Sequence, residues 1–167
     1  MHSPHHQSPP PLGDLRYLSY RQAYVGVPES VPLARGHFAR VSKNSGLDPA
    51  IADMALLVLS EMVTNVVSHL GCRYLVSVSV VGMYQRRVRI EVYDPVSDRI
   101  PVMPPKGGIV DGDADGGRGL GIIVMLSAHC GVTPDANGKI VWAELDLTEA
   151  DVSAAPAPCG GGAPVSR

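Results

Sequence analysis

The chain has 167 residues, of which 45% are hydrophobic, and its 14 basic and 16 acidic residues give a formal net charge of -2. This length suits one domain with its own core, and the charge lacks the basic excess that attracts nucleic acid. The most apolar stretch, residues 50–70, is interrupted by Asp53, Glu61 and Asn65, so we expect no membrane-spanning segment. Three cysteines without C-x-x-C spacing, and an N-terminus unlike a secretion signal, favour a cytoplasmic protein with reduced thiols.

The two ends of the chain differ in composition from the middle. Residues 1–14 are rich in proline, histidine and serine, and residues 151–167 are rich in alanine, proline and glycine. Segments of this kind bury too little apolar surface to fold. We therefore predict two disordered tails around one domain at residues 15–150.

The first half of this domain is predicted to contain a strand at 20–25 and an amphipathic helix at 30–45. Asp48-Pro49 then pairs an N-cap acid with proline at the first helical position, which predicts a second helix. That helix is expected to end near His69, because Gly71 follows it.

The second half is predicted to contain most of the sheet. Alternating apolar and polar residues indicate strands at 74–81, 87–93 and 139–147, and a third helix is expected at 118–130. Residues 95–117 contain four prolines and five glycines, which predicts a long loop of the lid or binding type. The expected fold is a two-layer α/β sandwich, with a mixed, mostly antiparallel sheet covered by helices on one face.

The second predicted helix carries a polar stripe. Glu61, Asn65 and His69 are spaced four residues apart and lie on one face. One interpretation is an ordinary solvent-facing stripe. The other makes Glu61 a general base and Asn65 an oxygen ligand for Mg²⁺, which commonly uses few protein ligands. His69 is expected to be a helix-end or packing residue.

Asp94 ends a predicted strand and precedes Pro95, where the chain must leave the sheet. A carboxylate at this position can accept a hydrogen bond from an exocyclic amine such as that of adenine. The alternative is an ordinary turn acid.

A glycine-rich segment leads into the third predicted helix. Glycines let backbone N–H groups approach phosphates closely, and a helix N-terminus adds positive potential. Arg118 can contact phosphate oxygens as a fork. The alternative is a flexible helix entry, although so many glycines are costly there unless something must approach closely. The candidate phosphate-binding residues are Gly117, Arg118, Gly119, Leu120 and Gly121.

Three competing motifs are excluded. Residues 111–116 open like a calcium-binding EF-hand loop, but the twelfth position is Ile122, where a bidentate Glu is needed. The glycine segment is not a dinucleotide-binding fingerprint, because no strand feeds it and its spacing fails at Ile122. It is not a P-loop either, because no Gly-Lys-Ser/Thr follows.

In order, these motifs resemble the histidine-kinase-like ATPase superfamily (the Bergerat ATP-binding fold), and most closely its bacterial branch of anti-sigma-factor serine/threonine kinases. In that branch the N box reads Ser-Glu-Leu-Val-Thr-Asn-Ala-Val-x-His, and residues 60–69 read Ser-Glu-Met-Val-Thr-Asn-Val-Val-Ser-His. The strand end at 92–94, the glycine box at 117–121 and the closing strand at 138–145 complete the match.

The resemblance implies ATP and Mg²⁺ as cofactors, with Glu61 as the catalytic base, Asn65 as the Mg²⁺ ligand and Asp94 as the adenine acceptor. It also implies a sigma factor and an anti-anti-sigma protein of the STAS type as partners, and homodimers are common in the branch. The chain departs from the branch at Val96, where sensor-kinase relatives have glycine, and at Ile140, where the branch often has a hydroxyl residue that supports adenine through water.

The leading hypothesis is a cytoplasmic ATP-dependent kinase that phosphorylates a partner protein on Ser or Thr. A second hypothesis is a nucleotide-gated binding module without useful catalysis, which sequesters a sigma factor or another regulator. A simple ATPase of the gyrase or MutL type is disfavoured, because no transducer domain follows residue 147.

Overall fold

A computed structural model describes residues 18–82, 86–106 and 117–148 of the chain. The predicted tails at 1–14 and 151–167 lie outside the described residues, and so does the acidic stretch at 107–116. The described part contains the five strands and three helices discussed below.

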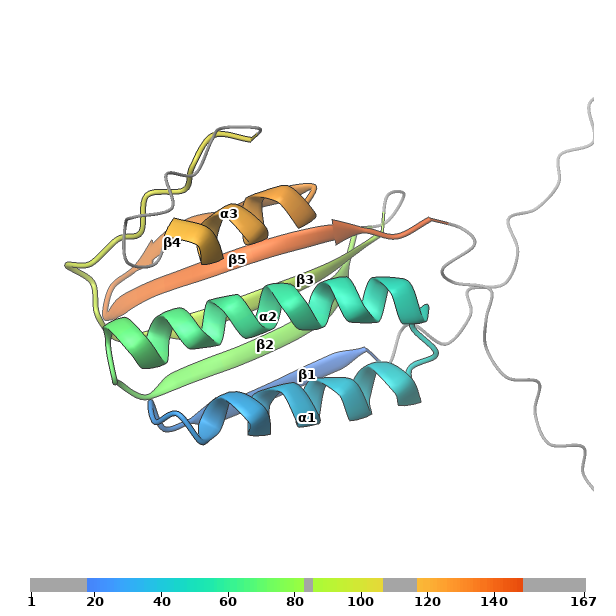
Figure 1. Cartoon of the computed structure of the whole chain (residues 1–167), viewed down its shortest axis with the longest axis horizontal. Helices are drawn as coiled ribbons and strands as arrows, with labels where there is room; N and C mark the ends of the chain where they lie inside the picture. The colour runs from blue at the N-terminus through green and yellow to red at the C-terminus, as the bar shows by residue number, and fades with distance from the viewer. Residues whose placement is uncertain (1–17, 83–85, 107–116, 149–167) are drawn as a thin grey trace, which may run out of the picture.

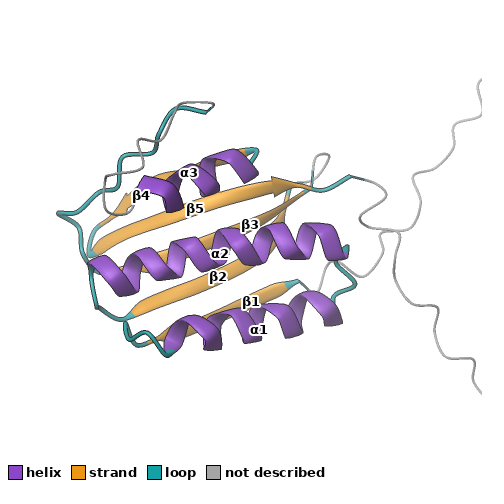
Figure 2. Cartoon of the chain, in the orientation of Figure 1, coloured by secondary structure: helices purple, strands orange, loops and turns teal. Residues whose placement is uncertain are grey.

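The strands form one antiparallel sheet with the order β1-β2-β3-β5-β4. All three helices cover one face of this sheet, as Figures 1 and 2 show. The predicted two-layer α/β sandwich is therefore confirmed, and each pairing in the described sheet is antiparallel. The elements are β1 (Ser19–Tyr24), α1 (Ser30–Asn44), α2 (Pro49–His69), β2 (Tyr74–Val81), β3 (Arg87–Asp94), α3 (Gly117–Leu126), β4 (His129–Asp135) and β5 (Gly138–Asp146).

Helix α2 begins and ends where its capping residues predict. The Asp48 carboxylate accepts hydrogen bonds from the backbone N–H of Ala50, at 2.8 Å, and of Ile51. This satisfies two donors that a helix start leaves unpaired. At the other end Gly71 has a φ of 59°, a left-handed conformation that glycine adopts without steric cost, and its N–H returns to the Val66 carbonyl.

The core lies between the sheet and the three helices, and α2 contributes the largest share of its helical residues. Inward-facing residues of β3 alternate with half-buried polar ones, and α2 turns an apolar stripe toward them. By length and composition α2 is the one helix of the described residues that is long and apolar enough to cross a membrane, although from the sequence we expected no such run. A core helix passes the same test, and α2 packs against the sheet through Ala55, Val58, Leu59, Met62, Val63 and Val66.

The C-terminal half contains a strand that the sequence pattern did not predict. The third helix ends at Leu126 instead of residue 130, and His129–Asp135 forms β4 at the edge of the sheet. Gly131, the residue after the expected end of this helix, lies in β4 against Trp142 of β5: a methyl group there would be 3.0 Å from Trp142 Cζ2. Pro134 is tolerated because an edge strand leaves some backbone groups unpaired.

Candidate nucleotide site

Glu61 and Asn65 are held one turn apart in α2, and both side chains are half-buried. The residue before Glu61 is fixed by hydrogen bonds. The Ser60 hydroxyl donates to the Leu56 carbonyl, and the Arg35 guanidinium of α1 donates to the Ser60 hydroxyl at 2.6 Å. Helix α1 therefore supports the segment of α2 that presents the carboxylate.

Gly119 of α3 lies directly against both side chains. A methyl group on Gly119 would lie 2.8 Å from Glu61 Oε2 and 3.4 Å from Asn65 Oδ1. The first of these distances is too short for a real Cβ, so a larger residue at position 119 would require the Glu61 carboxylate to move aside. The structure thus brings the predicted base, the predicted metal ligand and the predicted phosphate-binding segment together.

The other residues of the glycine segment surround this contact. Gly117 is the first residue of α3, Arg118 is exposed, and Leu120 and Gly121 are half-buried. The backbone N–H groups of a first helical turn have no partner within the helix, so they are available to an anion. An exposed guanidinium beside them adds a second kind of donor for phosphate oxygens.

Asp94 lies at the end of β3 and is only 1% exposed. Its Oδ1 accepts from the Val96 backbone N–H at 3.0 Å and from Lys139 Nζ at 2.9 Å. Its Oδ2 is buried and has no hydrogen-bond partner among the described residues. A buried, unpaired carboxylate oxygen is costly, which is the condition expected of an acceptor that serves a ligand.

Lys139 is the residue of this site that sequence reasoning missed. It pairs in register with Asp94 across β3 and β5, and it turns inward, whereas Ile140 turns to the opposite face of the sheet. Ile140 therefore lies on the face of the sheet away from Asp94. A signal was present, because the inward alternation of Val141, Ala143 and Leu145 extends back to Lys139.

The candidate residues gather at one end of the molecule. Figure 1 shows the C-terminal end of α2 (green), the start of β5 and the start of α3 (orange) on the same left-hand side. Asp94 ends β3 at this side, since it pairs with the second residue of β5. Arg99, in the loop that follows, donates to the His69 carbonyl at 3.0 Å, which ties this loop to the end of α2.

A model of the histidine kinase-like ATPase domain matches residues 26–145. The chain belongs to this family. Family membership implies an ATP-binding domain with ATP-dependent kinase or ATPase chemistry, in which Mg²⁺ commonly accompanies the nucleotide. Among curated proteins, a sequence search finds no significant match.

Two structural observations agree with ATP binding by this domain. Gly119 brings backbone without a side chain against Glu61 and Asn65, and Asp94 Oδ2 is an acceptor without a partner in the described residues. No group of three His, Cys, Asp or Glu side chains within the described ranges can hold a metal. Mg²⁺ would therefore depend on Asn65, water and phosphate oxygens.

Cys72 lies close enough to Asp94 for the carboxylate to affect the pKa of its thiol. Burial raises the pKa of the Cys72 thiol, and the nearby Asp94 carboxylate raises this pKa further. The backbone of Cys72 is also in close contact with Gly26, where a methyl group would lie 2.2 Å from the Cys72 carbonyl oxygen. Cys72 and Cys130 are both free thiols.

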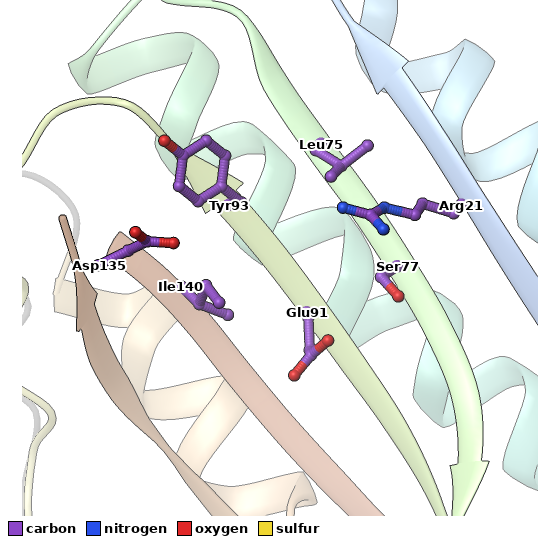
Figure 3. A pocket seen from close by; sticks show the side chains of 7 residues that line it. All are labelled: Arg21, Leu75, Ser77, Glu91, Tyr93, Asp135 and Ile140. Carbon is purple, nitrogen blue, oxygen red and sulfur yellow. The ribbon is translucent and has the colours of Figure 1, made fainter. Parts of the chain in front are cut away.

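A separate pocket, of about 330 Å³, lies on the face of the sheet turned away from the helices (Figure 3). It is distinct from the candidate nucleotide site, because Tyr93 and Asp94 are consecutive in β3 and point to opposite faces. Its lining side chains are Arg21, Leu75, Ser77, Glu91, Tyr93, Asp135 and Ile140.

Proposed function

We propose that the protein is an ATP-dependent serine/threonine kinase of the cytoplasm that phosphorylates a partner protein and acts as an anti-sigma factor. One observation carries the chemical part of the proposal: Gly119 lies against both Glu61 and Asn65. The motif likeness to the anti-sigma kinase branch supports the regulatory part, and the family match supports ATP binding.

In the proposed reaction, bound ATP supplies the γ-phosphoryl group. The Glu61 carboxylate accepts the proton of the attacking Ser or Thr hydroxyl as the new O–P bond forms and the bond to ADP breaks. Asn65 contributes its amide oxygen to Mg²⁺, and the first turn of α3 with Arg118 donates hydrogen bonds to phosphate oxygens. Asp94 accepts from the exocyclic amine of adenine.

The proposed partners follow from the same likeness. The substrate would be an anti-anti-sigma protein of the STAS type, and the client would be a sigma factor that the kinase sequesters. Homodimer formation is part of this proposal, because dimers are common in the branch.

The first test is calorimetry of Mg²⁺-dependent ATP binding by the wild type, Asn65→Ala and Asp94→Asn. We expect wild-type binding, and a loss of about tenfold or more in each variant, because each removes a hydrogen bond or metal contact in a shielded site. Lys43→Met, on the far end of α1, is the matched surface control. Absence of wild-type binding would overturn the proposal.

A second measurement separates catalysis from binding. With labelled ATP and STAS-type proteins as phosphate acceptors, the wild type should label a serine or threonine, while Glu61→Gln should bind ATP and leave no phosphoprotein. Nucleotide binding and sigma-factor binding without any phosphoprotein in the wild type would favour the nucleotide-gated module instead. Phosphate release without a protein acceptor would favour a simple ATPase.

A further inference from the structure

Lys139 is buried beside Asp94, the residue predicted to accept a hydrogen bond from adenine. The Lys139 and Asp94 side chains are 3% and 1% exposed, and their charged atoms lie 2.9 Å apart. Removing two charges from water is expensive, and the pair is tolerated only where each partner also makes other hydrogen bonds. Here Asp94 Oδ1 accepts from the Val96 N–H, and Lys139 Nζ donates to the Val96 carbonyl at 2.5 Å.

Some hydrogen-bonding groups of Lys139 and Asp94 have no partner among the described residues. An ammonium group has three N–H donors, and Lys139 uses two of them, on Asp94 Oδ1 and on the Val96 carbonyl. Within the described residues no acceptor is recorded for the third, and Asp94 Oδ2 likewise has no donor. Among the described residues, the buried pair therefore has one acceptor, Asp94 Oδ2, and one N–H donor of Lys139 with no partner.

We propose that Lys139 is a specificity-determining residue for the base of the nucleotide. It occupies Asp94 Oδ1, so that Oδ2 is the acceptor left for the base, and its remaining N–H serves an acceptor atom of the same base edge. This inference rests on the proposed ATP binding. It goes beyond that function because it assigns base selection to a pair of residues and not to Asp94 alone.

The donor and acceptor of the Asp94–Lys139 pair complement those on the edge of adenine but not those on the edge of hypoxanthine. The adenine edge places an amino donor next to a ring-nitrogen acceptor, which complements the free acceptor of Asp94 and the free donor of Lys139. The hypoxanthine edge reverses this order, with a carbonyl acceptor next to an N–H donor. Both of its groups would face groups of the same kind, and an unmatched buried polar group is strongly disfavoured.

Without Lys139 this selection should weaken. The ring nitrogen of adenine would lose its donor, and the N–H of hypoxanthine would no longer face a donor. One of the two mismatches against hypoxanthine would thereby be removed.

The test measures the dissociation constants of ADP and inosine diphosphate, both with Mg²⁺, by calorimetry at neutral pH. The wild type should prefer ADP by about tenfold or more. Lys139→Met, which keeps the length of the side chain but removes its charge and donors, should bring the ratio of the two constants closer to one. Lys43→Met removes the same group from an exposed site on α1 and should keep the wild-type ratio.

The binding data can overturn either the inference about Lys139 or the proposed function itself. A Lys139→Met variant that folds and keeps the wild-type ratio would overturn the inference, as would one that binds ADP more tightly, since Lys139 would then compete with the base. If this variant unfolds, Asp94→Asn/Lys139→Met is compared with Asp94→Asn: the inference predicts that the second change alters the ratio further, and an unchanged ratio would overturn it. A wild type that binds neither nucleotide refutes the proposed function itself. A wild type that binds both equally refutes base selection by the pair.

Discussion

Gly119 of α3 and Glu61 of α2 are in such close contact that a methyl group on the glycine would lie 2.8 Å from Glu61 Oε2. Two segments more than fifty residues apart in the sequence are thereby brought to one point. A side chain at position 119 would therefore require the Glu61 carboxylate to change its position.

Gly119→Ala should weaken Mg²⁺-dependent ADP binding by about tenfold or more, because the new methyl group must displace the Glu61 side chain or move α3. Calorimetry measures the loss, and circular dichroism checks that the fold is kept. The matched control is Gly36→Ala in α1, where a methyl group meets nothing within 4 Å. That variant should gain about 0.5–1 kcal/mol of stability and bind ADP normally. Equal binding by the two variants would contradict the prediction.

Gly138→Ala should destabilise the fold strongly. A methyl group on Gly138 would lie 2.1 Å from the Asp94 carbonyl oxygen, and backbone cannot move aside as a flexible side chain can. We expect a loss of about 2 kcal/mol or more in the free energy of unfolding, measured by urea denaturation. A loss below about 0.5 kcal/mol would show that β3 and β5 separate easily at this end of the sheet.

The parts of the fold that were predictable are those with local signals. Asp48-Pro49 and Gly71 define the ends of α2, and the alternation in residues 87–94 defines β3. The edge strand β4 was not predictable, because Gly131 and Pro134 disfavour a strand locally and only pairing with β5 stabilises it.

The residues of the candidate site were also only partly predictable from the sequence. Glu61, Asn65 and Gly119 were selected from spacing and motif likeness, and the structure brings them together. Their roles remain predictions. Lys139 was overlooked because a single lysine in a strand ordinarily points to solvent, and only the register of β5 against β3 turns it toward Asp94.

Cys72 should react slowly with iodoacetamide at neutral pH, because burial and the Asp94 carboxylate raise the pKa of its thiol and so reduce the thiolate fraction. Its rate should rise as the pH increases. Bound Mg²⁺-ADP should slow it further if the base lies near Asp94. Peptide mass mapping distinguishes Cys72 from Cys130, whose thiol pKa is also raised by burial and which serves as the internal control. Equal protection of both thiols by ADP would argue against a local effect.

Alkaline pH should destabilise the protein through Tyr24. Burial raises the pKa of Tyr24 from 10.0 to about 12. The folded state therefore holds the phenolic proton more tightly than the unfolded state, so this contribution is complete below pH 10 and is lost as the pH rises toward about 12. In urea denaturation across this range, Tyr24→Phe should lose less stability with pH than the wild type. Tyr93→Phe, on the opposite face of the sheet, should follow the wild type.

The register that pairs Asp94 with Lys139 also limits how this sequence can change length. The turn at 136–137 joins β4 to β5, so deleting or inserting one residue there would shift these two strands by one position against each other. If β4 kept its place, β5 would also shift against β3, and either Gly138 or Ile140 would stand opposite Asp94 in place of Lys139. We therefore expect homologous chains to vary the length of the loop before α3 more freely than the length of this short turn.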